Sequence, residues 1–197
     1  MFSPKNLLIH LFFALICIGL FLNGSSEATL FWNMVWALLA LDFSLLVRQN
    51  NHFASKLLIT PFWLFFYPNT FYILTELVNI PLNSLSFTDS NSFVPVGISI
   101  LCVLFGIMAG VESVESIIKG FNINFYGLRL LMITSLSFVS SYSIYIGKLY
   151  GLTSWDIFTQ PLVVLNAMFS AVTWDTFPFI LGFSFVQIMV LVFAVDE

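Results

Sequence analysis

The chain has 197 residues, of which 59% are hydrophobic and only 8% are charged, and its mean hydropathy is +1.00. A soluble domain carries roughly 25% charged residues, so water cannot be the main solvent of this chain. The net charge of −4 rests on few residues, and six lysines and arginines scattered along the chain cannot form a phosphate-binding stripe. A nucleic-acid partner is therefore excluded.

Long apolar segments recur along the whole sequence. A transmembrane helix takes about 20 apolar residues, so about five to seven spans would use up the chain. We expect a single integral membrane domain over residues 1–197, an all-α helix bundle whose main partner is the lipid bilayer. Six segments fit this expectation: Leu7–Leu22, Thr29–Val47, Leu57–Asn79, Val94–Val111, Phe125–Ile146 and Phe177–Val195.

Several of these segments have features of their own. The first resembles a secretory signal core, but we take it as a retained helix because every later segment is also membrane-like. Cys17 and Cys102 lie within apolar segments and are expected to pack there unpaired. Pro68 interrupts the third segment, and since proline removes a backbone donor and biases Tyr67 away from helix, we expect a kinked or broken helix.

The stretch Ile157–Val172 is ambiguous. It is apolar enough to touch the membrane, but Gln160, Pro161 and Asn166 interrupt it. A re-entrant or interfacial helix before the last span fits this pattern better than a seventh span.

Basic residues predict the orientation of the bundle. Lys5, Arg48, Lys56 and Lys119 fall in alternate loops, and lysine and arginine accumulate on the cytoplasmic side. The opposite loops hold Glu27, Asp89, Asp156 and Asp175, with Lys148 as the only basic residue. Both termini are therefore predicted to be cytoplasmic, in a multi-pass protein of the cell membrane.

Two polar clusters are expected at the outer face. The first follows Pro68, where Asn69, Tyr72 and Glu76 are spaced to share one helix face. An ionisable group beside a membrane segment is costly to hold there and indicates function. The alternative is that Glu76 reaches head-group water while Asn69 repairs the broken helix.

The second cluster runs from Gly147 to Asp156. Thr153 and Asp156 have the spacing of a helix-capping box, and Trp155 is a natural interfacial anchor. The functional interpretation instead places Lys148 and Asp156 beside Glu76 at the mouth of the bundle.

The other candidates are weaker. Asp42 is expected to form a structural pair with Arg129, with a proton relay as the alternative. Glu115 and Lys119 are interpreted as a solvated helix end. His10 and His52 are isolated, so we expect no metal site, and no cofactor motif is present. The sequence contains no recognisable catalytic set, which leaves enzymatic activity undecided.

The two clusters, in this order and spacing, resemble motifs of a bacterial family of multi-pass membrane proteins known only as domain of unknown function thirteen sixty-one. That family has P-N-x-x-Y-x-x-T-[DE]-L in mid-bundle and G-R-x-x-R-x-N-S-W-D before the last helix. The matching residues here are Pro68, Asn69, Tyr72, Thr75, Glu76 and Leu77, then Gly147, Ser154, Trp155 and Asp156, together with Asn33 beside Trp32. The resemblance covers most of the chain and implies no reaction.

The second motif departs from the family pattern at three positions. Lys148 and Gly151 replace arginines, and Thr153 stands where asparagine is usual. Lysine keeps the charge without the bidentate fork, and glycine loses the charge. If the family's arginines hold an anionic head group, this member should hold it more weakly or bind something else.

Three functions from different classes stay open. The first is a regulatory or scaffolding membrane subunit that acts through a protein partner. The second is an enzyme or binder acting on an envelope lipid or carrier at the outer face, with Glu76, Lys148 and Asp156 converging. The third is a small transporter, because discontinuous helices often line substrate sites.

Overall fold

The computed structural model describes residues 4–22, 28–79, 90–153 and 155–195. These residues form α1 (Pro4–Leu22), α2 (Ala28–Gln49), α3 (Phe53–Phe66), α4 (Pro68–Tyr72), the 3-10 segment η1 (Ile73–Asn79), α5 (Ser90–Gly120), α6 (Tyr126–Tyr150), α7 (Asp156–Thr159), α8 (Pro161–Ser170), η3 (Trp174–Thr176) and α9 (Phe177–Ala194). Within these ranges there is no strand, and the predicted all-α fold is confirmed.

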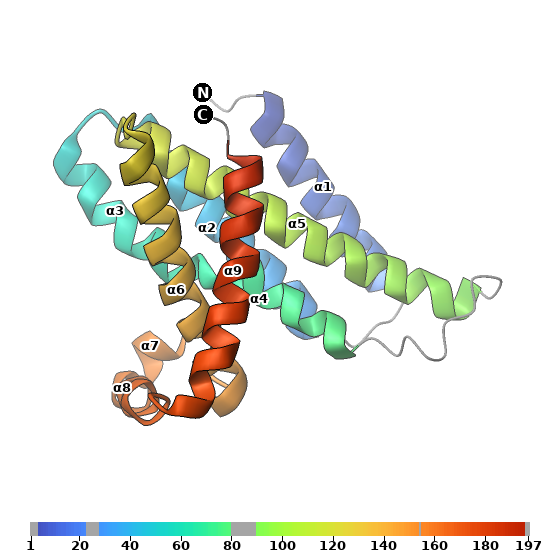
Figure 1. Ribbon diagram of the computed structural model, residues 1–197. Helices are drawn as coiled ribbons and strands as arrows, with labels where there is room; N and C mark the ends of the chain where they lie inside the picture. The colour runs from blue at the N-terminus through green and yellow to red at the C-terminus, as the bar shows by residue number, and fades with distance from the viewer. Residues whose placement is uncertain (1–3, 23–27, 80–89, 154, 196–197) are drawn as a thin grey trace.

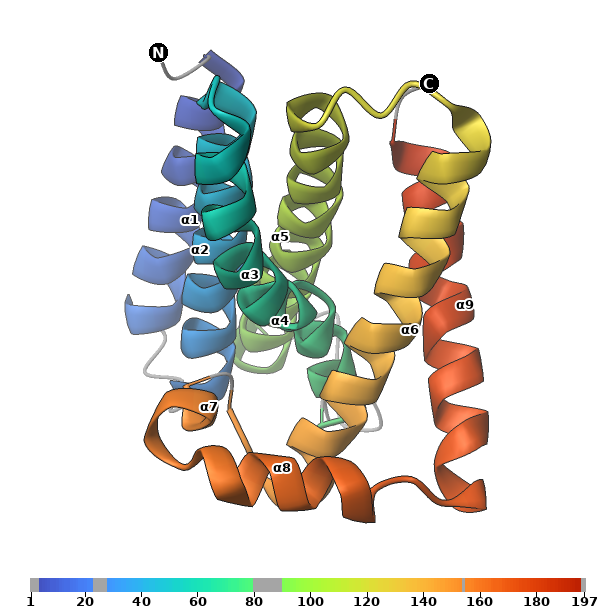
Figure 2. The ribbon, with the colours of Figure 1, turned by 90° about the vertical axis from the view of Figure 1, so that its left-hand side faces the viewer.

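Six helical stretches of the described chain are long and apolar enough to cross a membrane: α1, α2, α3 continued through α4 and η1, α5, α6, and η3 continued into α9. They run side by side as a bundle (Figures 1 and 2). The number and the positions of the six apolar segments that were predicted to span the membrane are thus confirmed. The start of α1 and the end of α9 lie at one end, which we call the terminal end, and α7 and α8 lie at the opposite end, the α8 end.

The ambiguous stretch forms α7 and α8, which lie across the α8 end of the bundle instead of running along it (Figure 2). With 10 residues, α8 is about 15 Å long, half of the roughly 30 Å hydrocarbon core. A helix of this length is too short for a seventh span and fits the expected re-entrant or interfacial helix.

The third span is broken at Pro68, as predicted, but one detail of the prediction is wrong. Tyr67 keeps helical dihedrals, with φ −54° and ψ −43°. The break arises instead because Pro68 has no N–H and the chain tightens beyond it, where Thr70 N–H donates to Tyr67 O at 3.0 Å. The span continues as short α4 and then as η1.

Glycines of α5 let this broken segment pack closely. A Cβ atom on Gly106 would lie 2.7 Å from the carbonyl oxygen of Thr70, and one on Gly110 would lie 2.7 Å from the Thr70 hydroxyl. The spacing G-x-x-x-G is a known device for close approach of membrane helices. Substitution of either glycine would push α4 away from α5.

A polar seam joins α6 to α9 inside the bundle. Ser184 Oγ donates to Ser141 Oγ at 3.0 Å, and Gln187 Nε2 donates to the same oxygen at 2.8 Å. All three residues are buried. Hydrogen bonds between polar side chains are a usual way to hold membrane helices together, since lipid supplies no hydrophobic force between them.

At the terminal end two carboxylates are buried, although a solvated helix end was expected there. Glu112 is 5% exposed and Glu115 is 7% exposed. Glu112 forms an ion pair with Lys5 of α1, and Glu115 forms one with Lys119. The predicted Glu115–Lys119 pair is thus confirmed. However, α1 packs over this turn of α5 and removes its carboxylates from solvent.

Candidate functional site

The candidate site lies at the α8 end, where η1 and α6 meet. Lys148 Nζ donates to Glu76 Oε1 at 2.7 Å. The Glu76 side chain is 13% exposed and that of Lys148 is 33% exposed. The predicted proximity of these two residues, from segments distant in sequence, is confirmed. Because α6 continues to Tyr150, Lys148 lies on a helix and not in the turn that follows.

Tyr72 forms one wall of this site. The Lys148 ammonium lies 4.9 Å from the centroid of the Tyr72 ring, a cation–π arrangement. Gly147 makes the contact possible, since a Cβ there would lie 3.1 Å from the Tyr72 ring and 3.1 Å from Leu152 O. The tyrosine and glycine shared with the family motifs therefore fit each other.

Asn69 and Thr75 repair the broken helix. Asn69 Nδ2 donates to Phe66 O at 3.0 Å, and Thr75 Oγ1 donates to Tyr72 O at 2.6 Å. Each side chain thus satisfies a carbonyl beside the irregular turns. These contacts assign both residues a structural use.

Asp156 does not join Glu76 in any contact that we observe; it caps the chain before α7. Its Oδ2 accepts from the Thr153 N–H at 2.6 Å and from the Thr153 hydroxyl at 2.8 Å. The backbone hydrogen bond, and then the hydroxyl, hold the pKa of Asp156 below its ordinary value. The predicted capping contact is confirmed, whereas Ser154 lies outside the described residues.

Trp155 anchors α7 to the bundle through aromatic stacking. Its ring stacks on Trp36 of α2, with centroids 6.3 Å apart, and Trp36 stacks on Phe66 at 5.4 Å. One turn from Trp36, Asn33 is 7% exposed and its Nδ2 has no hydrogen-bond partner among the described residues. This stack was not predicted; the spacing of Trp32 and Trp36 on one helix indicates only the contact between these two rings.

Gly151 explains one departure from the family motif. This residue caps the C-terminal end of α6 with φ +66°, in the left-handed region. Glycine adopts that conformation without the steric cost of a side chain, so it suits this helix end.

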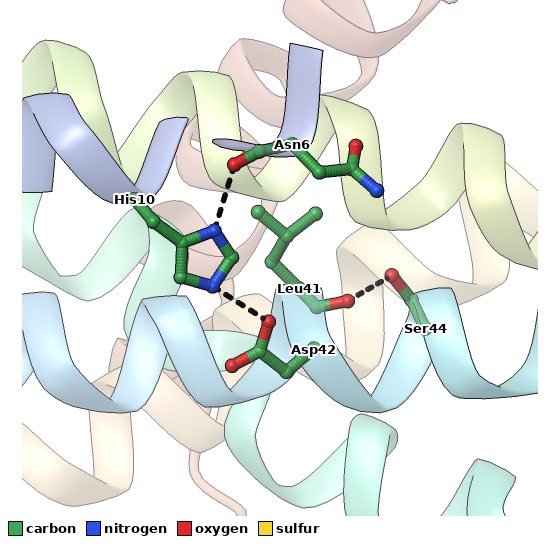
Figure 3. A network of polar contacts seen from close by, with 5 residues as sticks. All are labelled: Asn6, His10, Leu41, Asp42 and Ser44. Atoms are coloured by element: carbon green, nitrogen blue, oxygen red, sulfur yellow. Dashed lines mark hydrogen bonds and ion pairs between the residues drawn. The ribbon is translucent and has the colours of Figure 1, made fainter. Parts of the chain in front are cut away.

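The predicted Asp42–Arg129 pair is wrong. Asp42 Oδ1 lies 3.1 Å from His10 Nε2, while His10 Nδ1 lies 2.7 Å from Asn6 O (Figure 3). Arg129 Nε instead donates to Ile123 O at 2.7 Å. His10, expected to be isolated, thus links α1 to α2.

The hydrogen bond to Asn6 O indicates which tautomer a neutral His10 ring adopts. A carbonyl only accepts, so His10 Nδ1 must carry a hydrogen, and a neutral ring then has none on Nε2. The contact with Asp42 is a hydrogen bond only when one further proton lies between the ring and the carboxyl.

The side chains at the α8 end can bind a polar ligand. Glu76 and Lys148 neutralise each other, Asp156 is a cap, and no group of three metal-ligating side chains occurs in the described ranges. Cys17 and Cys102 are not joined in a disulfide, as expected. Partners for a polar ligand are the free donors of the Lys148 ammonium, the Tyr72 ring and the Asn33 amide.

Comparison with known proteins agrees with the motif resemblance. No curated protein and no solved structure matches the chain. A family model described as "Protein of unknown function (DUF1361)" matches residues 32–190, which include both polar clusters, three complete spans and most of two others. The chain therefore belongs to this family of proteins of unknown function.

Proposed function

We propose that this membrane protein is a regulatory or scaffolding subunit that binds another membrane protein through α8. The observation behind the proposal is the surface of α8. Only Ala167 of this helix is buried, and Leu162, Leu165 and Phe169, which share one face, are 74%, 48% and 79% exposed. No charged residue occurs between Asp156 and Asp175.

An interfacial helix that simply rests on a membrane has a charged face for the water side and an apolar face for the lipid. The exposed surface of α8 carries no charged side chain on either flank; apart from Asn166 and Ser170 it is apolar, with Val163 at 47% and Met168 at 40% exposure. Lipid can cover one flank. The other would face water, and an exposed apolar patch of this kind is typical of a protein interface.

Binding at α8 could influence the rest of the bundle. The Tyr142 hydroxyl donates to Met168 O, and the Phe158 ring contacts Phe65 at 5.9 Å. Through these contacts α8 is tied to α6, which carries Lys148, and the adjoining α7 is tied to α3, which precedes Glu76 in the third span. In the predicted orientation this face lies outside the cell, so the partner is an envelope protein with an apolar surface at that depth.

The test uses charge substitutions on α8. The tagged full chain is isolated in mild detergent from its own cells, as wild type, as Leu162→Glu with Phe169→Glu, and as Ser170→Glu. The last variant adds charge to the same helix at an exposed position without removing an apolar side chain. We expect a stoichiometric partner with wild type and Ser170→Glu, and its loss from the double variant.

Two results would contradict the proposal. One is a chain that isolates alone, or only with copies of itself. The other is a double variant that inserts normally and keeps the same partner in the same amount.

A second candidate function is binding of an envelope amphiphile with an anionic head group beside Lys148. The observation that favours it is the buried Asn33 amide with no partner among the described residues, near the end of α2 that packs on η1. Glu76→Gln would free Lys148 and should tighten binding to vesicles that contain phosphatidylglycerol, whereas Lys148→Met should weaken it. Unchanged binding in both variants would exclude this candidate.

A further inference from the structure

A groove of about 740 Å³ runs between α1 and α5. Its apolar walls are two helix stripes, with Leu8, Phe12 and Leu15 on α1 facing Leu101, Leu104 and Met108 on α5. The exposed fractions of these side chains lie between 50% and 66%. The two helices thus leave a half-open apolar channel along the bundle instead of closing on each other.

The length of the groove matches one membrane leaflet. It extends from Leu8 to Gly19, eleven residues along α1, which corresponds to about 16 Å. Half of the hydrocarbon core of a bilayer is about 15 Å thick. The far end is closed where Gly19 faces the side chain of Ile98, at 3.8 Å from the position of an added Cβ. An acyl chain inserted from the terminal end would fill the groove.

The mouth of the groove is charged. Lys5, Glu112 and Glu115 line it at the terminal end, and Ala194 of α9 borders it. The Lys5 side chain is 63% exposed, whereas those of Glu112 and Glu115 are only 7% and 9% exposed. Lys119, the partner of Glu115, is 46% exposed. The mouth therefore offers an accessible ammonium above two deep carboxylates.

From this geometry we propose that the groove binds one phospholipid whose head group contains a primary amine, such as phosphatidylethanolamine. Its phosphate accepts hydrogen bonds from Lys5, which has three donors, and its ammonium donates to the carboxylates of Glu112 and Glu115. An anionic head group without an amine could accept hydrogen bonds from Lys5 but would bring no donor to the two carboxylates. A choline head group has the right charge but no N–H to donate.

The proposal is independent of partner binding at α8, because the groove opens at the other end of the bundle. Purified full-length chain is mixed with equal amounts of phosphatidylethanolamine, phosphatidylcholine and phosphatidylglycerol with identical acyl chains, and native mass spectrometry counts the lipid adducts. We expect phosphatidylethanolamine to exceed each competitor on the order of tenfold, as charge-assisted hydrogen bonds would produce.

Variants separate the head-group site from the groove. Glu112→Gln with Glu115→Gln should abolish the preference for phosphatidylethanolamine over phosphatidylglycerol while adducts still form, because it removes the acceptors for the lipid amine and the ion-pair partners of Lys5 and Lys119. Leu104→Trp, which fills the groove, should reduce adducts of all three lipids. Leu131→Trp is the matched control, because this lipid-facing residue of α6 is 63% exposed and lies outside the groove.

Equal retention of the three lipids by wild type would overturn the proposal. So would a Leu104→Trp variant that keeps as much lipid as Leu131→Trp. The comparison of Leu104→Trp with Leu131→Trp still tests the proposal if the variant with both glutamines fails to fold.

Discussion

Replacing Gly110 by alanine tests how α5 holds the broken third span. The added Cβ would lie 2.7 Å from Thr70 Oγ1 and 3.0 Å from Thr70 Cβ. Thr70 is fully buried, and its hydroxyl donates to Tyr67 O at 2.7 Å, so it cannot turn away without losing that bond. The methyl group must therefore displace α4 from α5.

The magnitude follows from these contacts. Overpacking of a filled site costs about 1–3 kcal/mol, and loss of the Thr70 hydrogen bond adds about 0.6 kcal/mol, the average for such bonds in a membrane protein. The better helix propensity of alanine returns about 0.5–1 kcal/mol. We expect the free energy of unfolding of Gly110→Ala to fall by about 1–3 kcal/mol.

The assay is unfolding in mixed micelles with rising dodecyl sulfate, followed by tryptophan fluorescence. Gly97→Ala and Gly182→Ala are matched controls, because an added Cβ at either position meets no atom within 4 Å. Both controls should be neutral or slightly stabilising. If Gly110→Ala proves as stable as Gly97→Ala, the close packing of α4 on α5 is refuted.

Three further predictions use the same unfolding assay. Lys148→Met should lower the free energy of unfolding by about 1–2 kcal/mol, a value between those for exposed and buried ion pairs, because it removes the ion-pair partner of the Glu76 carboxylate. Adding Glu76→Gln should restore most of this loss, and no restoration would contradict the pairing. Gly151→Arg should cost about 1–2 kcal/mol, since an L side chain at positive φ is strained; a neutral effect would contradict the assigned cap. Asp156→Ala should cost up to about 1 kcal/mol. The pKa of Asp156 is lowered by Thr153, so the cap stabilises at neutral pH and is lost as the pH falls through that lowered pKa; an equal cost at pH 7 and pH 2 would refute it.

The spans could be predicted from sequence because membrane insertion depends on the hydropathy of each segment alone. Local contacts could be predicted for a similar reason. The Thr153–Asp156 cap needs only two residues three apart, and the break at Pro68 needs only the missing N–H. The contact between Glu76 and Lys148 could also be predicted, since both residues were expected at the same depth in the membrane.

Partner choice across helices could not be predicted in the same way. Asp42 could pair with Arg129 or with His10, and it contacts His10 because α1 lies beside α2. The burial of Glu112 and Glu115 likewise depends on α1 lying over α5. Hydropathy specifies that a segment crosses the membrane and leaves open which neighbours its polar residues will meet.

The central claim is that α8 has a protein partner, and site-specific photo-crosslinking tests it most directly. A photoreactive residue is placed at Phe169 on α8, 79% exposed, or at Phe185 on α9, 67% exposed and within a membrane span. After irradiation of intact cells, the account predicts one defined protein adduct from position 169 and none from position 185. No protein adduct from position 169, or the same adducts from both positions, would contradict it.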